Sequence, residues 1–333
     1  MATSDGLKYV QRHSIESPST LKDSSVIRTE TDLQECRRLW SIFSPQQDAW
    51  DDWDLMYAFH DQDKHRLNFL VHQSDDETPN GLIPLVYDTG LNRYMLMGGS
   101  YPDGRILWLR YEDFPEFFGQ FPERTVLFDL KQSWVSGLLQ LHPEFDSYFA
   151  EPDLRYYLAP PDFGFDFDKH LDTLPADKKP KFLYDLRNIR KREPTLQWSE
   201  KDEAELFIDL VNRNFGAESD YANPEDALEV RRVVHELESS GRLRTMTIEI
   251  DGVRQAVSLS LLHNNKMVAL YASSNNDYNN LGKLLNVETI NEACRLRVDE
   301  ISFMVGMQWK ANWKMTSEPC NTFRKPVAPW SAE

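Results

Sequence analysis

The sequence has few cysteines and no long hydrophobic run. Its 333 residues include three cysteines, which lie far apart and form no CxxC pair: Cys36, Cys294 and Cys320. This predicts neither a disulfide framework nor a zinc knuckle and favours a reduced intracellular protein. No stretch approaches the roughly 18 to 20 apolar residues that a membrane helix needs. Residues 1–25 are polar and lack the apolar segment of a secretory signal, so we expect a cytoplasmic protein without a membrane span.

Positive charge is also scarce. There are 37 Lys and Arg against 54 Asp and Glu, which gives a formal net charge of −17. Such a surface repels phosphate backbones and disfavours broad nucleic-acid binding, but it is compatible with a basic small-molecule or peptide partner. The exception is the stretch 178–192, in which seven of fifteen residues are Lys or Arg. We interpret it either as an exposed helix face or as a site for an anionic substrate, such as a nucleotide-sugar precursor or a tRNA end.

Several catalytic motifs are absent. The sequence contains no GxSxG, GxxxxGK[ST], GxGxxG or HExxH pattern. A short polar cluster, His60, Asp61, Asp63 and His65, matches no defined metal-site spacing and is more typical of a solvated helix end. We therefore expect no bound metal and no covalent nucleophile.

Hydrophobic residues make up 41% of the chain and aromatic residues 12%, which is enough for packed cores. The length suggests about two domains. A linker rich in Pro, Gly, Phe and Asp occupies residues 160–168. We predict a loose leader at residues 1–25, an N-terminal domain at 26–160, a C-terminal domain at 161–320 and a tail at 321–333.

The two halves show the same order of predicted elements: two helices, three strands, a helix and a strand. In the first half we expect a helix capped by Thr31, a helix opened by Pro45, strands at 67–71, 81–87 and 94–97, a helix at 114–121 and a strand at 125–130, followed by a helix at 134–141 and a strand at 148–158. The second half has helices at 204–214 and from Pro224, strands at 243–250, 254–262 and 267–272, a helix at 284–296 and a strand at 300–305. The repeated order predicts a duplicated α/β unit of about 150 residues, although unrelated two-domain proteins share such rhythms.

The loop before the last long helix is the most informative stretch. Asn279-Asn280-Leu281-Gly282-Lys283 leads from a strand into an apolar helix. Helix N-termini bind phosphate because their first amides are unpaired and the macrodipole is positive there. Gly282 allows close approach to the backbone, and Lys283 adds a counter-charge. The alternative is an ordinary Asn-rich loop that caps a helix.

On several stretches the chain resembles the N-acyltransferases of the GNAT superfamily. It is more closely similar to the branch of acetyltransferases associated with cellulose biosynthesis, which is related to the Fem-type peptidoglycan aminoacyltransferases. The stretches that carry this resemblance are the basic run 178–192, the hairpin 250–256, Leu270–Ser273 with the loop to Gly282, and 306–313, with Trp53 and 81–85 in the first half. The resemblance spans about residues 30–315. It implies an α/β (α+β) fold of two tandem GNAT-like units, with mixed, mostly antiparallel sheets flanked by helices.

The resemblance also implies a mechanism in which an amine attacks the thioester of acetyl-CoA or another acyl-CoA directly. It implies Asp277 as a base, Tyr271 or Tyr278 as an acid for the leaving thiolate, and Lys310 near the reacting groups. The donor would be held by Leu270, Ala272, Ser273, Asn280, Leu281, Gly282 and Lys283. The alternative is that these residues are loop caps and core aromatics, with Lys310 a surface lysine packed on Trp309 and Trp313.

Three functions remain open at this point. The first is an acyl-CoA-dependent N-acyltransferase whose acceptor is an amino sugar, an amino acid or a small peptide. The second is an aminoacyl-tRNA-dependent ligase of the Fem type, which makes tRNA the one nucleic acid we consider. The third is a non-catalytic binding module. It is favoured by a weakened glycine loop, because Lys283 and Leu284 follow Gly282 where the superfamily has a second small residue.

Overall fold

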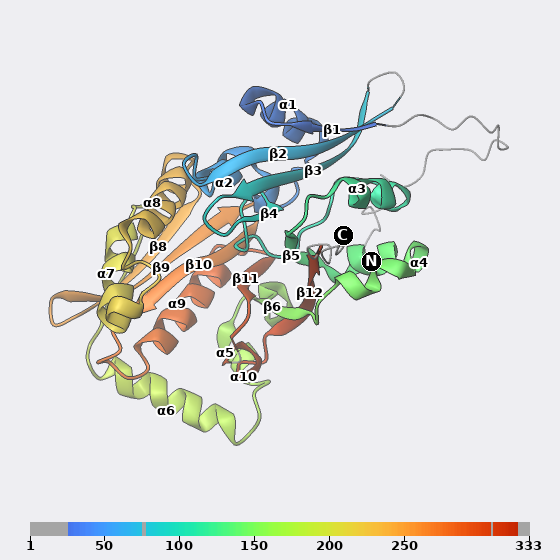
Figure 1. Cartoon of the computed structure of the whole chain (residues 1–333). Helices are drawn as coiled ribbons and strands as arrows, with labels where there is room; N and C mark the ends of the chain where they lie inside the picture. The colour runs from blue at the N-terminus through green and yellow to red at the C-terminus, as the bar shows by residue number, and fades with distance from the viewer. Residues whose placement is uncertain (1–25, 75–77, 308, 326–333) are drawn as a thin grey trace.

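The computed structural model describes residues 26–74, 78–307 and 309–325, so the predicted leader lies outside the described residues (Figure 1). The first half of the chain contains β1 (Val26–Glu30), α1 (Leu33–Phe43), α2 (Trp53–Ala58), β2 (His65–Gln73), β3 (Pro79–Asp88), β4 (Arg93–Leu96), α3 (Phe114–Gln120), β5 (Thr125–Lys131), α4 (Gln132–Leu141) and β6 (Asp153–Leu158). The second half contains α5 (Phe167–Leu171), α6 (Lys178–Arg190), β7 (Thr195–Ser199), α7 (Ala204–Phe215), α8 (Pro224–Ser239), β8 (Leu243–Ile250), β9 (Val253–His263), β10 (Lys266–Ser274), α9 (Leu281–Arg295), β11 (Glu300–Val305), α10 (Trp309–Asn312) and β12 (Thr316–Arg324). Short 3-10 helices cover Ala49–Asp51, Tyr111–Asp113, Pro143–Tyr148, Pro160–Phe163 and Gly216–Glu218.

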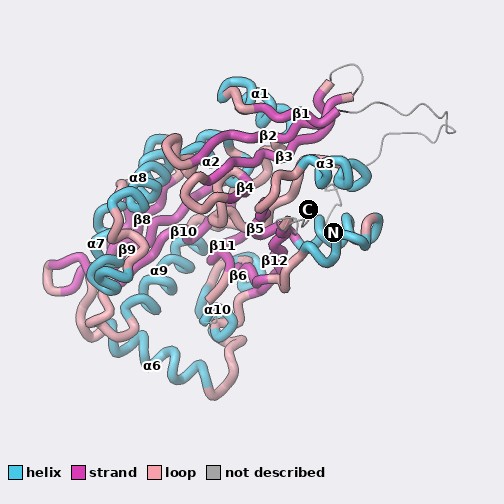
Figure 2. Tube along the Cα trace, in the orientation of Figure 1, coloured by secondary structure: helices cyan, strands magenta, loops and turns pink. Residues whose placement is uncertain are grey.

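The repeated order of elements is confirmed. Two helices, three strands, a helix and a strand occur as α1 to β5 and again as α7 to β11. All strands form one twelve-stranded sheet in the order β1-β2-β3-β4-β5-β12-β6-β11-β10-β9-β8-β7 (Figure 2). The β4–β5 and β10–β11 pairs are parallel, and the other neighbours are antiparallel. The predicted α/β class with a mixed, mostly antiparallel sheet is therefore confirmed, and the two half-sheets are joined into one.

The join is made by two exchanged strands. The last strand of the first half, β6, pairs with β11 of the second half. The last strand of the chain, β12, returns to pair with β5 of the first half, and β6 and β12 pair with each other. The sheet thus continues across the predicted boundary at residue 160, and residues 321–324 of the predicted tail belong to β12.

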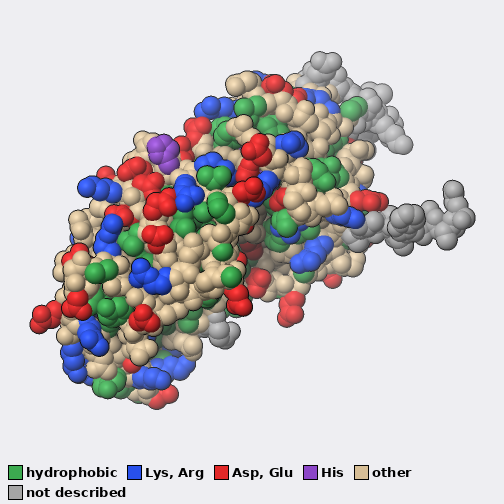
Figure 3. Space-filling model, turned by 60° about the vertical axis from the view of Figure 1, so that its left-hand side comes forward, with side chains coloured by type: hydrophobic (Ala, Val, Ile, Leu, Met, Phe, Trp, Pro, Cys, Tyr) green, Lys and Arg blue, Asp and Glu red, His purple; other side chains and the backbone are tan. Residues whose placement is uncertain are grey.

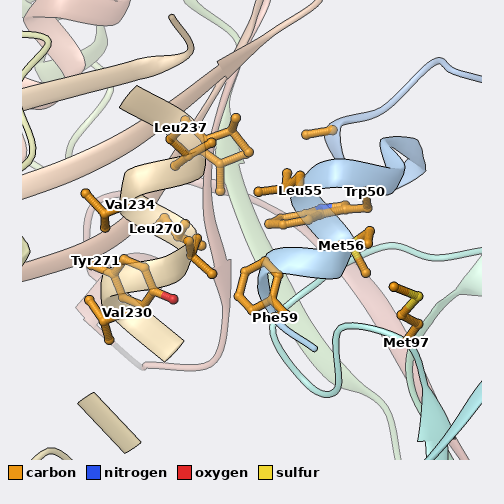
Figure 4. Close-up of a cluster of buried hydrophobic side chains, with 14 of the residues drawn as sticks. Trp50, Leu55, Met56, Phe59, Met97, Val230, Val234, Leu237, Leu270 and Tyr271 are labelled. Carbon is orange, nitrogen blue, oxygen red and sulfur yellow. The ribbon is translucent and has the colours of Figure 1, made fainter. Parts of the chain in front are cut away.

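Helices cover both faces of the sheet. On one face, α1 and α2 of the first half and α7 and α8 of the second share one hydrophobic core. Figure 4 shows Trp50, Leu55 and Phe59 of the first half facing Leu237 and Tyr271 of the second. On the other face, α3 and α4 cover the first half, while α5, α6 and α9 cover the second. The shared core fixes the two halves to each other, since α2 packs against α8.

Several predicted boundaries are wrong for local reasons. The cap of α1 is Asp32, whose carboxylate accepts from the amide of Glu35, and not Thr31. The second helix begins at Trp53 with Asp52 as its cap, and not at Pro45. The predicted strand at 148–158 is reduced to Asp153–Leu158, because a 3-10 helix ends at Tyr148 and residues 149–152 belong to no strand. In the part of the chain that the structure describes, no helix is both long enough and apolar enough to cross a bilayer.

Candidate active site

The parallel strands β10 and β11 separate soon after they begin. They pair at Lys266↔Glu300, Met267↔Ile301 and Val268↔Ser302, and at no later position among the described residues. From Ala269 onward, β10 pairs on one side with β9 alone. The edge of β10 that faces β11 therefore carries backbone amides and carbonyls without a strand partner. Such an opening between parallel strands can accept an extended ligand.

A β-bulge lies at the point where the strands separate. The register between β9 and β10 shifts between Ala269 and Tyr271, so Leu270 is the extra residue. Leu270 and Tyr271 consequently both face the shared core of α7 and α8, while Ala269 faces the core under α9. A bulge turns backbone groups out of the ladder, and here it does so at the mouth of the opening.

The loop after β10 ends at a helix N-terminus without a side-chain cap. Asn280 precedes α9 in the left-handed conformation (φ 69°), and its side chain makes no capping hydrogen bond. The first-turn amides of α9, including those of Gly282 and Lys283, point out of the helix toward this loop. A Cβ atom at Gly282 would lie 3.0 Å from Oγ of Ser274, so glycine keeps the helix start close to the end of β10. This is the geometry of an anion site.

A groove of about 490 Å³ runs between this loop and α6. It is lined by Tyr184, Asp185, Asn188, Ile189 and Arg192 from the basic run, and by Asp277, Tyr278, Asn279 and Asn280 from the loop. Tyr184 is 58% exposed, although it is aromatic. Lys283 reaches into the same region, where its ammonium pairs with Asp185 and lies 5.1 Å from the ring centre of Phe182. The groove therefore offers an aromatic face and an arginine next to the start of α9.

The corresponding opening in the first half is closed by the chain itself. Strands β4 and β5 also separate after two pairs, Tyr94↔Thr125 and Met95↔Val126. Arg105 fills this gap: its amide donates to the carbonyl of Asp129 (2.9 Å), and its carbonyl accepts from the amide of Lys131 (2.8 Å). Arg105 is 8% exposed, and its guanidinium donates to the carbonyl of Met97 at 2.7 Å. Two similar openings thus exist, and one is plugged.

A cleft of about 730 Å³ lies between the first half and α8. Its walls are the α2–β2 and β3–β4 turns, the loop that carries Tyr101, and the segment from Ala217 to Glu229. On the side of the molecule that carries α7 and α8, a hollow separates the two lobes, and acidic side chains are common around it (Figure 3). The hydroxyls of Tyr101 and Tyr221 lie 3.4 Å apart in this cleft.

The inner end of the cleft lies beside the bulge. The ring of Tyr101 packs edge-on against Tyr271 of β10, with centroids 5.7 Å apart. Glu229 of α8 lines the same end, and burial raises the pKa of its carboxyl to about 7. Burial also raises the pKa of Tyr101 and Tyr271, so both are neutral phenols. A titratable carboxyl and a set of phenols therefore meet where the two strands part.

These features agree with a known sequence family. Residues 181–315 match the acetyltransferase (GNAT) domain. The matched segment, 181–315, contains β10, the bulge, the loop and α9. No curated protein matches the sequence.

Solved structures extend the similarity to nearly the whole chain. FemX shares 10% identity and a TM-score of 0.55 over 90% of this chain and 97% of its own. A tandem GNAT protein from the clavulanic acid biosynthesis pathway shares 10% identity and a TM-score of 0.52, over 92% of this chain and 100% of its own. L-PGS from Bacillus licheniformis shares 10% identity and a TM-score of 0.53, over 90% and 94%. At these identities the likeness concerns the fold, which is that of tandem GNAT proteins. The branch associated with cellulose biosynthesis stays a prediction.

The structure divides the predicted site residues between two faces of the segment 181–315. Leu270, Ala272 and Ser273 end β10, and Asn280 to Lys283 begin α9, so the predicted donor residues do lie together. Asp277 is exposed and lines the groove with Tyr278, away from the lining of the acidic cleft. Tyr271 points to the other face, toward the cleft. The counter-charge predicted for Lys283 is already paired with Asp185.

Lys310 is not a surface lysine, so that alternative is wrong. It is 4% exposed, and its ammonium donates to the carbonyls of Phe303 (2.5 Å), Met304 (3.2 Å) and Val305 (3.1 Å). Burial lowers its pKa to about 8. All three ammonium donors are thus engaged at the end of β11, where the strand leaves the sheet.

We expect Lys310→Met to destabilise the protein, since three carbonyls lose their donor at once. An orphaned buried polar group costs about 1 to 3 kcal/mol, so the free energy of unfolding should fall by at least about 2 kcal/mol. Urea unfolding followed by tryptophan fluorescence measures this change. Lys314→Met, at an exposed lysine four residues on, is the control and should change little. Equal stability of the two variants would contradict a structural role for Lys310.

Sequence reasoning missed Tyr101, Tyr221 and Glu229. Glu229 lies beside the apolar stripe of α8, where Ala227, Val230 and Val234 are buried, so it resembles any helix-flank glutamate. Tyr101 and Tyr221 lie in loops without periodicity. Their proximity depends on the packing of α2 on α8, which no local pattern encodes. The polar cluster of His60, Asp61, Asp63 and His65 was expected to be a solvated helix end, but His60 is 7% exposed and packs on Tyr57, with a ring-centre distance of 5.4 Å.

Proposed function

We propose that the protein is an N-acyltransferase that moves an acyl group from acyl-CoA to an amine, at the opening between β10 and β11. The observation that carries this proposal is the bulge at Leu270, located where the strands part and next to the uncapped start of α9. A thioester needs a hydrogen-bond donor at its carbonyl oxygen as negative charge develops there. A free amide of the bulge supplies it, and the first turn of α9 receives the donor's phosphates.

In this proposal the acceptor enters from the acidic cleft. Glu229 accepts a proton from the ammonium, and the free amine attacks the thioester carbon. The new C–N bond forms as the C–S bond breaks. The leaving thiolate takes its proton from a neutral phenol, for which Tyr271 is placed on the cleft side of β10. The second proton that the nitrogen loses as the amide forms restores this phenol. Glu229 replaces Asp277 as the base, because Asp277 lines the other groove.

Aminoacyl-tRNA is the second candidate donor. It is favoured by Arg192 and the exposed Tyr184 in the groove beside α9, since an arginine and an aromatic ring suit a terminal nucleotide. Against it stands the net charge of −17. The salt dependence of binding grows with the number of phosphates that the protein contacts. The affinity for acyl-CoA, which has few phosphates, should therefore fall little as salt is raised, whereas the affinity for tRNA should fall steeply. A salt series of donor binding therefore separates the two donors.

We expect Gly282→Val to weaken acetyl-CoA binding by at least about tenfold, because the side chain intrudes between the helix start and the ligand. The chain should still fold, since the one close contact of the added Cβ is the hydroxyl of Ser274. Calorimetric titration with acetyl-CoA measures the effect. Gly119→Val in α3, where a Cβ meets nothing within 4 Å, is the matched control. Equal affinities for both variants would overturn the donor site.

A further inference from the structure

A small pocket lies beside the plugged opening of the first half. It measures about 110 Å³ and reaches from Arg105 to Lys266, the first residue of β10, so both halves of the chain line it. A single water needs roughly 10 to 15 Å³, so a molecule of several heavy atoms fits. The residues proposed to hold the donor and the acceptor lie outside its lining. Its apolar walls are formed by Pro45, Trp50, Pro84, Leu96, Ile106 and Trp108.

Positive charge exceeds negative charge in this pocket. The charged side chains that line it are Asp48, Asp51, Arg105, Lys131 and Lys266. Lys266 pairs with Asp48 at 3.1 Å. The carboxylate of Asp51 accepts hydrogen bonds from two backbone amides of the preceding turn, at 2.9 Å each. Within the residues that the structure describes, Arg105 and Lys131 form no ion pair, so these two cations are not matched by a carboxylate.

Arg105 is a buried cation with one unused donor group. Its Nη2 atom donates to the carbonyl of Met97, whereas Nη1 is buried without a hydrogen-bond partner among the described residues. Burial lowers the pKa of the guanidinium to about 9, so it stays charged at neutral pH, and Asp129 and Asp51 oppose this shift without pairing with it. Burial raises the pKa of Asp129 to about 7, so this carboxyl is only partly ionised. A buried cation without a full counter-charge is costly, and a bound anion reduces that cost.

Lys131 faces the same part of the pocket as Arg105. Both cations act electrostatically on the carboxyl of Asp51, where burial raises the pKa and Lys131 opposes the rise. Gly104 makes room for this lysine, since a Cβ atom at Gly104 would lie 3.3 Å from Cε of Lys131. The two unmatched cations therefore converge beside the apolar walls.

We infer that this pocket binds a small organic anion, namely a carboxylate that carries a short apolar group. Lys131 donates a charge-assisted hydrogen bond to the carboxylate, and the guanidinium of Arg105 adds a second positive charge. The apolar group packs against Trp108 and Pro84, where it is removed from water. Inorganic phosphate has the negative charge but no apolar part, so it should bind more weakly. This site is separate from the proposed acyl transfer and does not depend on it.

Probes of one length test the inference on the full chain without any donor. They are butanoate, butan-1-ol and butan-1-amine, whose end group is negative, neutral and positive, with inorganic phosphate as the fourth probe. Calorimetry in chloride buffer at constant ionic strength measures their binding. We expect butanoate to bind at least about tenfold more tightly than butan-1-ol or phosphate, and butan-1-amine to bind weakest.

A pair of lysine variants tests the assignment of the charge. Lys131→Met keeps most of the apolar stem, and it should weaken butanoate binding by at least about fivefold while leaving butan-1-ol binding unchanged. Lys201→Met, at an exposed lysine outside the pocket lining, is the control for net charge and should bind butanoate as the wild type does. The wild-type comparison of butanoate with butan-1-ol decides the inference even where Lys131→Met fails to fold.

Each contrary result overturns one part of the inference. Equal affinities of butanoate and butan-1-ol, no binding of either, or equal affinity of the two lysine variants for butanoate would overturn the site. Phosphate that binds more tightly than butanoate would overturn the carboxylate class. Competition between butanoate and acetyl-CoA would overturn a pocket separate from the donor site.

Discussion

Glu229→Gln is expected to lower turnover by about 10² to 10⁴-fold, which is the usual contribution of a general base. Glutamine keeps the shape of the side chain and cannot take the proton of the attacking ammonium. The rate of CoA release from acetyl-CoA in the presence of an amine acceptor measures this. Glu205→Gln is the matched control, because it removes a carboxylate that pairs with Arg231 on the surface of the same helix pair. A Glu229→Gln enzyme as fast as this control would leave the base unassigned.

The pH dependence of kcat/KM is a second test of Glu229 as the base. Burial raises the pKa of Glu229 to about 7, with Asp226 and Asp61 adding to it and Arg232 and Lys64 opposing it. The base is active when ionised, so kcat/KM should rise with pH up to about 7 and then level off. In Glu229→Gln this rise should be lost.

Because the native pKa of Glu229 lies above the ordinary value of 4.5, the carboxyl's contribution to the stability of the fold falls as pH rises from about 4.5 to 7. The variant should therefore be no less stable than the wild type at pH 8.

Phe323→Ala should destabilise the first half of the molecule, although Phe323 lies in the last strand of the chain. This ring is 0% exposed and packs against Phe121 (5.5 Å), Phe149 (5.5 Å) and Tyr148 (5.9 Å) of the first half. Truncating a buried phenylalanine costs about 3 to 5 kcal/mol. Chemical unfolding should report this loss, and hydrogen exchange should speed up in β5, with which β12 pairs.

Arg324→Ala provides the comparison for this substitution. The neighbouring side chain is exposed and should cost less than about 0.5 kcal/mol. If the two variants unfold alike, or if exchange in β5 is unchanged in Phe323→Ala, the exchanged position of β12 is contradicted.

The sequence predicted those parts of the fold that local patterns encode. The hairpin of β8 and β9 turns at Asp251-Gly252, and α7 and α8 have clear apolar periodicity, so these elements were predicted with nearly correct limits. Strands β1, β7 and β12 were missed. Three of the five residues of β7 are exposed, and β12 contains Pro319, which normally argues against a central strand. Its central place comes from the exchange with β6, which is a long-range pairing.

The candidate site was likewise predicted only where a local sequence pattern marks it. The loop before α9 was found because a glycine at a helix start carries a local signal, and the structure gives it an uncapped N-terminus. The bulge at Leu270 was not predicted as such, because nothing in LYAS distinguishes a bulge from a regular strand. The acidic cleft could not be predicted from the sequence, since Tyr101 and Glu229 come from different halves of the chain. They are brought together by long-range contacts between the halves, such as the packing of α2 on α8 and of Tyr101 on Tyr271.

We propose that one opening of the sheet, in the segment 181–315, receives an acyl-CoA donor while Arg105 plugs the other. Calorimetric titration of the full chain with acetyl-CoA tests it most directly, because the stoichiometry counts the open sites. We predict one donor per chain, with binding weakened by Gly282→Val and unaffected by Gly119→Val. Two donors per chain would contradict the plugged opening of the first half, and no binding at millimolar acetyl-CoA would contradict the proposed donor site itself.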